Sequence, residues 1–145
     1  MKDKNCCYCM KDENPSLYEK FGYRVCDLKV STLFVFKEQS HYGRVIVAYK
    51  DHVGDISELS DEEMDLFMKD VKNVTKALHK AFNPDKINFG AYSDTLNHLH
   101  FHLVPKYHTD SFEWGATFAM NPNRKVATIE ECKEIANKIL PYLEK

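Results

Sequence analysis

Three histidines alternate with apolar residues in the stretch His98-Leu99-His100-Phe101-His102-Leu103-Val104. Alternation with a period of two predicts a β-strand, because successive side chains of a strand point to opposite faces. One face of this strand would therefore carry three imidazoles, while Leu99, Phe101 and Leu103 on the other would enter the core. The whole chain has seven histidines, so three of them on one strand face indicate a functional site and not an ordinary polar surface.

The composition excludes several classes of protein. A chain of 145 residues with 43% hydrophobic and 29% charged residues is typical of a globular protein, and we expect one domain over 1–145. The formal net charge of −2 gives no basic field, so a nucleic-acid polymer is not expected as a partner. The sequence shows neither an apolar run of membrane-spanning length nor the apolar core of a signal peptide, and we therefore expect a cytoplasmic protein that uses no membrane.

The N-terminal segment, residues 1–15, holds three of the five cysteines. Cys6 and Cys9 have the Cys-x-x-Cys spacing with which two thiolates can chelate one zinc ion, but tetrahedral zinc needs two further ligands. A second Cys-x-x-Cys is absent from the sequence, so histidines would have to supply them. The residues alone leave two interpretations open: a zinc site, or a reduced N-terminal turn without a ligand.

The strand signals are grouped in two halves of the chain. β-branched and aromatic residues predict two or three strands within 22–50, and apolar residues predict another strand over 86–92. The histidine stretch is the last predicted strand, and we expect Pro105 to end it or its pairing because proline has no amide to donate.

Two capping boxes predict the helices. Ser60 with Glu63 precedes a long amphipathic pattern that Asn83-Pro84 stops, and Thr128 with Glu131 precedes a second one. Tight connections between the strands favour antiparallel pairing. We therefore predict an α+β fold, with an antiparallel sheet of about five strands, one long central helix and a C-terminal helix. Residues 106–127 have no clear period, and 106–145 is interpreted as a C-terminal extension that carries the second helix.

Two kinds of chemistry could use the three imidazoles. A single metal ion fits poorly, because a rise of ~3.3 Å per residue separates the Cα atoms of His98 and His102 by roughly 13 Å. A phosphate lying along the strand face would touch all three rings. In that arrangement His100 is the natural nucleophile toward phosphorus, and its two neighbours would neutralise the phosphate oxygens.

The pattern His-φ-His-φ-His-φ-φ, where φ is apolar, resembles the signature of the histidine triad superfamily of nucleotide hydrolases and transferases, and the chain matches it at all seven positions. The resemblance extends from about Cys6 to Pro105. It implies a histidine-triad-like fold that pairs as a homodimer. It also implies that His100 attacks the α-phosphate of a nucleoside phosphoramidate or a dinucleoside polyphosphate to form a nucleotidyl-histidine, with His98 and His102 as supporting catalytic residues and no cofactor required for catalysis.

The resemblance further implies binding residues. Asn88 would contact the nucleotide, and Thr95 could donate a hydrogen bond to phosphate. Some members with an N-terminal Cys-x-x-Cys bind zinc structurally. The positions that match such a site here are Cys6, Cys9, His52 and His98.

Two candidate nucleotide contacts depart from the family pattern. Arg44 follows Gly43 where many members have a histidine, and arginine could serve as a phosphate or structural group but not as a proton donor near neutrality. Asp94 stands in a Ser-Asp pair where many members have Gly-Asn, so a carboxylate that repels phosphate would face a ribose hydroxyl or hold a histidine. These departures keep an alternative open, namely a nucleotide- or zinc-binding module with little turnover.

The remaining histidines and the tryptophan have ordinary roles when each is taken singly. A lone histidine is expected at the surface, and the one tryptophan is expected to pack the C-terminal extension. The residues concerned are His41, His52, His79, His108 and Trp114.

Overall fold

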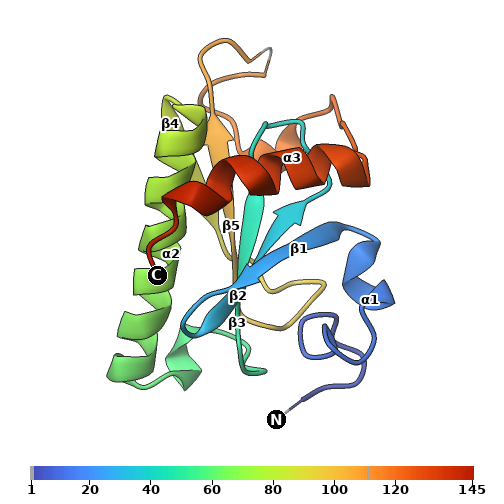
Figure 1. The fold of residues 1–145 in the computed structure, drawn as a ribbon, viewed down its shortest axis with the longest axis vertical. Helices are drawn as coiled ribbons and strands as arrows, with labels where there is room; N and C mark the ends of the chain where they lie inside the picture. The colour runs from blue at the N-terminus through green and yellow to red at the C-terminus, as the bar shows by residue number, and fades with distance from the viewer. Residues whose placement is uncertain (1, 111) are drawn as a thin grey trace.

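A five-stranded antiparallel sheet forms the centre of the computed structural model, which describes residues 2–110 and 112–145 (Figure 1). The strands, in chain order, are β1 (Gly22–Asp27), β2 (Ser31–Phe36), β3 (Val45–Tyr49), β4 (Lys86–Gly90) and β5 (His100–Lys106). They are arranged in the order β1-β2-β3-β5-β4, so β5 lies between β3 and β4. The helices are α1 (Ser16–Glu19), α2 (Asp61–Phe82) and α3 (Ile129–Ile139), with 3-10 turns η1 (Ile56–Glu58), η2 (Phe118–Met120) and η3 (Leu140–Tyr142). The predicted α+β fold is confirmed.

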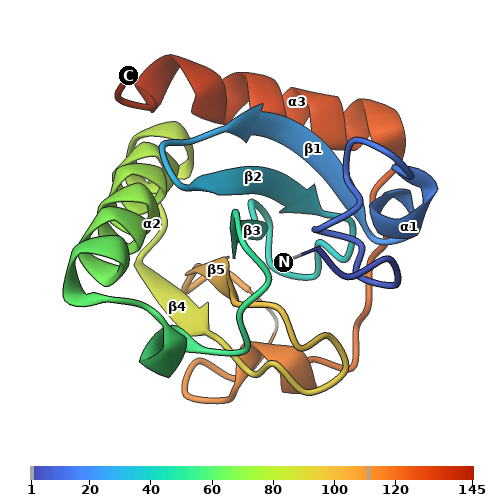
Figure 2. The same ribbon diagram turned by 90° about the horizontal axis from the view of Figure 1, so that it is seen from below.

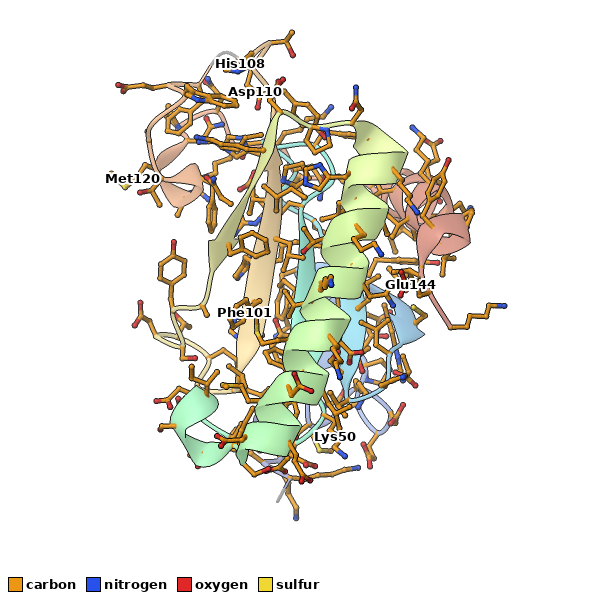
Figure 3. The ribbon with its side chains drawn as sticks, turned by 90° about the vertical axis from the view of Figure 1, so that its left-hand side faces the viewer. Lys50, Phe101, His108, Asp110, Met120 and Glu144 are labelled. Carbon is orange, nitrogen blue, oxygen red and sulfur yellow. The ribbon has the colours of Figure 1, made fainter. Side chains whose placement is uncertain are left out.

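One face of the sheet is covered by α2 and α3, and the main hydrophobic core lies between them and the strands (Figure 2). Phe67 of α2 meets Phe101 of β5 edge to face, with ring centroids 5.5 Å apart, and Phe101 lies beside α2 in Figure 3. The strand residues that build this core alternate along β2, β3 and β5, as the period of two requires. They are Leu33, Val35, Val45, Val47 and Leu103.

The opposite face of the sheet carries the histidines. Ile46 pairs with His102 and Ala48 pairs with His100 across β3 and β5, and directly paired residues of antiparallel strands share a face. The N-terminal segment packs over this face, where the residues Cys6–Cys9 join Phe34, Ile46 and Ala48 in a second buried cluster. The sheet thus separates a packing face from a face that holds the candidate site.

The long helix α2 begins and ends as predicted. Ser60 and Glu63 form the reciprocal capping box, and Asn83 ends the helix in the left-handed conformation with φ 49°. The second capping box, Thr128 with Glu131, begins α3. Within the described residues no helix, α2 included, is both long and apolar enough to cross a membrane.

The histidine strand differs from the prediction at both ends. β5 begins at His100, because the amides of His98 and Leu99 bond to loop carbonyls of Leu96 and Val53 and not to a strand ladder. At its other end β5 runs through Pro105 to Lys106, so proline does not end the strand. Its pairing with β3 does end at Leu103, while Pro105 still pairs with Ile87 of β4. β4 ends at Gly90, short of the predicted residue 92.

A buried carboxylate ties α2 to the turn between β1 and β2. Asp70 of α2 is 4% exposed, and it accepts hydrogen bonds from the Val30 amide at 2.9 Å, the Ser31 hydroxyl at 2.6 Å and the Lys29 amide at 3.3 Å. A buried carboxylate is stable only when such donors replace its hydration. The helix is therefore held against the sheet by a polar contact as well as by the apolar core.

We expect Asp70→Ala to lower the free energy of unfolding by about 2–4 kcal/mol, because the buried amide of Val30 and the hydroxyl of Ser31 lose their acceptor. Urea denaturation followed by circular dichroism measures this loss. Asp65→Ala is the matched control on the same helix: Asp65 pairs with Lys69 at 3.0 Å in an exposed ion pair, and its loss should cost no more than about 0.5 kcal/mol. Equal effects of the two substitutions would contradict the assigned role of Asp70.

Candidate functional site

His100 occupies the first position of β5 and is 7% exposed. Its Nδ1–H donates to the carbonyl oxygen of His98 at 2.5 Å. Because a carbonyl can only accept, the neutral ring of His100 carries its proton on Nδ1 and leaves the lone pair of Nε2 unprotonated. Burial lowers the pKa of His100 below its ordinary value, which favours this neutral form. Among the hydrogen bonds of the described residues none engages Nε2 of His100, so this ring nitrogen is presented in a fixed orientation.

His98 lies just before β5 and is fully buried. Its Nε2–H donates to the carbonyl oxygen of Tyr49 at 2.6 Å, and its Nδ1 faces the thiol of Cys6 at 3.4 Å. Burial lowers the pKa of His98 to about 4. Both ring nitrogens are engaged, so the expected phosphate that touches all three imidazoles does not match this arrangement. A phosphate on this face would meet His100 and His102.

His102 accepts a hydrogen bond from Arg44, the residue that precedes β3. Nη2 of Arg44 donates to Nδ1 of His102 at 3.1 Å, and Nη1 of Arg44 donates to Glu38 at 3.0 Å. Burial, and then the positive charge of Arg44, lower the pKa of His102 to about 3. Arg44 thus reaches the site through His102, and its own guanidinium is buried.

Aromatic side chains from three separate segments surround the imidazoles of His100 and His102. The Tyr8 ring lies 5.2 Å from the His100 ring, and the Phe36 ring lies edge-on at 5.2 Å from the His102 ring. Phe118, from η2 in the C-terminal extension, lies 6.2 Å from His102. Sequence reasoning singled out neither Tyr8 nor Phe118; the position of Tyr8 inside the Cys-x-x-Cys loop was the one available signal.

The structure places some of the predicted nucleotide contacts on the histidine face and others away from it. Asn88 of β4 pairs with Val104 of β5 and so lies on the histidine face. It also lines an open cavity of about 410 Å³ between β4 and the C-terminal extension. Asp94 and Thr95 are exposed in the loop between β4 and β5, and among the hydrogen bonds of the described residues none joins them to the three histidines.

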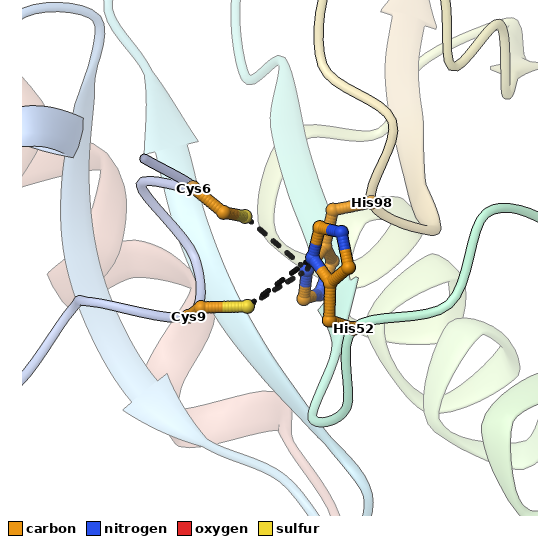
Figure 4. A group of neighbouring side chains, drawn as sticks. All are labelled: Cys6, Cys9, His52 and His98. Carbon is orange, nitrogen blue, oxygen red and sulfur yellow. Dashed lines mark hydrogen bonds between the residues drawn. The ribbon is translucent and has the colours of Figure 1, made fainter. Parts of the chain in front are cut away.

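Four predicted metal ligands converge at the N-terminal side of the histidine face (Figure 4). The ligand atoms all lie within 4.8 Å of one another and are contributed by Cys6, Cys9, His52 and His98. Nδ1 of His98 is 3.2 Å from Nδ1 of His52 and 3.6 Å from Sγ of Cys9, and Sγ of Cys9 is 3.3 Å from Nδ1 of His52. The family resemblance named these four residues as the positions that match a zinc site, and the fold brings all four together.

The donor set fits zinc. Two thiolates and two imidazoles are a common tetrahedral set, and bonds of about 2.0–2.3 Å place neighbouring ligand atoms roughly 3.3–3.8 Å apart. His98 also donates its other ring nitrogen to the carbonyl of Tyr49, which is how proteins usually orient a metal-bound imidazole. Cys7 is buried beside the cluster, but it is not among its four ligand residues.

The location predicted for one histidine outside the triad is wrong. His41 was expected at the surface, yet it is fully buried, and its Nδ1 lies 3.4 Å from the carboxylate of Asp110. The prediction is wrong because the C-terminal extension, whose lack of periodicity hid its path, packs over the loop that carries His41. His79 and His108 are exposed as predicted, and His108 stacks on Trp114 at 3.7 Å.

Residues 23–109 match the family model of the HIT domain. The chain belongs to the HIT family. Among curated HIT relatives, an uncharacterized HIT-like protein of Methanocaldococcus jannaschii is 32% identical over 97 residues, which are 64% of this chain and 72% of that protein. An adenosine 5′-monophosphoramidase of Schizosaccharomyces pombe is 30% identical over 84 residues, and the match spans 57% of this chain and 63% of the yeast protein.

Solved structures share the HIT fold. A histidine triad protein of Sinorhizobium meliloti has a TM-score of 0.80 at 19% identity, with 88% of this chain and 94% of that chain covered. A zinc-bound histidine triad family protein of Mycobacterium smegmatis has a TM-score of 0.59 at 16% identity, with 81% and 84% covered. These likenesses extend the agreement in fold beyond the matched domain into the C-terminal extension.

We expect the purified HIT protein to bind about one zinc ion per chain, and Cys6→Ser or Cys9→Ser to lose it, because one ligand of the tetrahedral set is removed. Metal analysis of protein prepared without chelators measures this. Cys7→Ser is the matched control, since it removes a buried thiol from the same loop but leaves the four ligands in place. Absence of zinc from the wild-type protein, or equal loss in all three variants, would contradict the assignment.

Proposed function

We propose that this HIT protein is a nucleotide hydrolase or nucleotidyl transferase that acts at the α-phosphate of a nucleoside phosphoramidate or a dinucleoside polyphosphate. The observation that carries the proposal is the state of His100, whose Nδ1–H is held by the His98 carbonyl at 2.5 Å. A neutral imidazole with one nitrogen free and the other anchored is a competent nucleophile toward phosphorus. The name of the Schizosaccharomyces pombe relative, an adenosine 5′-monophosphoramidase, supports this class of reaction.

The reaction proceeds in two displacements at phosphorus. Nε2 of His100 attacks the α-phosphorus, so an N–P bond forms while the bond to the leaving group breaks and its electron pair departs with that group. Water, or another acceptor, then attacks the nucleotidyl-histidine: an O–P bond forms, the O–H proton of the acceptor is released to solvent, and the electron pair of the N–P bond returns to Nε2. His102 donates its Nε2–H to a phosphate oxygen in both steps, and Asn88 contacts the nucleotide.

His98 acts in this scheme as a positioning residue. Its carbonyl fixes the tautomer of His100, and its imidazole belongs to the Cys/His cluster. We propose that the cluster holds a structural zinc ion, which anchors the N-terminal segment. Tyr8 lies between the two cysteines in sequence and packs against His100, so an anchored segment keeps this wall of the site in place. No catalytic step passes through the metal.

We also propose that the chain pairs with a second copy of itself along β4. This strand lies at one edge of the sheet, and Phe89 on it is 52% exposed. Leu66 and Met68 on the neighbouring helix α2 are exposed as well. An edge strand flanked by exposed apolar side chains favours burial against a partner.

His100→Ala should lower release of nucleoside monophosphate by at least about 10³-fold, because the covalent route is lost. The measurement is single-substrate kinetics with adenosine phosphoramidate and diadenosine tetraphosphate. His79→Ala, an exposed histidine on α2, is the control and should leave the rates unchanged. Substantial turnover by His100→Ala would overturn the mechanism. Nucleotide binding by the wild-type protein without turnover of either substrate would favour the alternative of a binding module.

A further inference from the structure

Arg44 is a site residue that departs from the family pattern. Its guanidinium lies between two aromatic rings, 4.4 Å from the centroid of Phe36 and 4.8 Å from that of Phe118. Glu38 neutralises part of its charge at 3.0 Å. Arg44 itself is 5% exposed, so this cation is fixed in one position and is not available to bind a phosphate in open solvent.

The contact between Arg44 and His102 determines where the proton of His102 resides. A guanidinium has donors and no acceptor, so Nδ1 of His102 must accept the hydrogen bond from Nη2 at 3.1 Å. The proton of the neutral ring is then on Nε2. A second proton would have to enter at Nδ1, where it would face the N–H of Arg44 and its positive charge, as well as the neighbouring His100 ring at 5.3 Å. His102 is thereby kept as a neutral hydrogen-bond donor.

We propose that Arg44 is a positioning residue that sets the leaving-group specificity of this site, which then expels groups that depart as anions and cleaves phosphorus–nitrogen bonds poorly. This inference rests on the proposed nucleotidyl-histidine reaction. It selects the phosphoanhydrides, such as dinucleoside polyphosphates, from the two substrate classes that the proposed function leaves open.

The chemical balance of the first displacement supplies the reason. When the bond to a bridging anhydride oxygen breaks, the electron pair leaves on a phosphate oxygen, which is stable as an anion and needs no proton. When a P–N bond breaks, the nitrogen must receive a proton, because an amide anion is far too basic to depart. An imidazolium can give that proton, but a neutral Nε2–H donor cannot. Burial and the Arg44 charge hold the pKa of His102 at about 3, far below the pH of the cell.

Kinetics on matched substrates test the proposal. We expect the wild-type protein to cleave adenosine phosphoramidate about 10²-fold more slowly than diadenosine tetraphosphate in kcat/KM, which is a typical contribution of general acid catalysis. For the 4-nitrophenyl, 4-chlorophenyl and phenyl esters of AMP, the rate should fall steeply as the leaving phenol becomes more basic.

Substitutions of Arg44 separate this role from a merely structural one. Arg44→Met should raise the phosphoramidate-to-anhydride ratio at pH 6 by at least about tenfold and flatten the dependence on the phenol, because His102 becomes able to take up a second proton. Arg44→Lys keeps a cationic donor beside His102 and should keep the wild-type phosphoramidate-to-anhydride ratio. Arg124→Met is the matched control: Arg124 also pairs with Glu38, at 3.5 Å, but is largely exposed. If Arg44→Met folds poorly, the double variant Glu38→Gln with Arg44→Met takes its place. It removes both charges of the ion pair and so leaves no unpaired carboxylate at the site.

Nitrogen-15 NMR of labelled histidine gives a readout that is independent of turnover. The wild-type spectrum should show His102 with a bare Nδ1 and a protonated Nε2 from pH 8 to pH 5, assigned by its loss in His102→Gln, whereas Arg44→Met should titrate. Equal cleavage of both substrate classes by the wild-type protein, an unchanged ratio in Arg44→Met, or an imidazolium at position 102 at pH 6 would each overturn the inference alone. Failure of the wild-type protein to cleave any of these substrates would instead overturn the proposed function on which the inference depends.

Discussion

The pairing of β5 with β3 is the contact on which the rest of the site depends. It places His100 opposite Ala48 and His102 opposite Ile46, so the two imidazoles share a face with small or aliphatic neighbours. The same register brings Arg44, the residue before β3, to the end of the pair where it can reach His102. A shift of one residue would turn both imidazoles into the apolar core beneath α2. The core residues on the other face therefore fix the register of β5 against β3 and also stabilise the fold.

Much of the fold could be predicted because it follows from local patterns. β-branched and aromatic residues indicated the strands within 22–50, and the period of two indicated the histidine strand. The two capping boxes located the starts of α2 and α3. Each of these signals depends on residues that lie close together in the sequence. The assignment to the HIT family and the antiparallel topology agree with them.

The site could be predicted less completely, for reasons that are equally physical. His98 falls on the alternation of the strand, but it lies outside β5, because its amide bonds to the loop carbonyl of Leu96. Its ring contacts Tyr49 and belongs to the cysteine cluster. His41 is buried by a segment without periodicity, and the partner of Arg44 is a residue 58 positions away. Contacts of this kind depend on which segments the fold brings together, and the spacing of residues in the chain does not encode them.

The proposed chemistry places two requirements on the histidine face that usually conflict. A nucleophilic imidazole must be neutral and partly shielded, whereas a substrate phosphate brings negative charge that calls for nearby cations. Here burial lowers the pKa of both His100 and His102, and the guanidinium of Arg44 beside His102 is already paired with Glu38. In the proposed reaction, this face would therefore meet the phosphate with oriented hydrogen-bond donors in place of net positive charge.

The position of β5 has a consequence for how the protein is made. β5 is the last strand in the sequence, yet it lies between β3 and β4, and within the part of the chain that the structure describes β4 joins the sheet through β5. During synthesis, β1, β2 and β3 can form a hairpin-connected unit early, while β4 must wait without a partner until residue 106 has left the ribosome. Closure of the sheet across the whole α2 segment is a long-range step, which is slow compared with hairpin formation. His100, the proposed nucleophile, and the completed sheet therefore arise in the same late event, and a chain that stops short of β5 has neither.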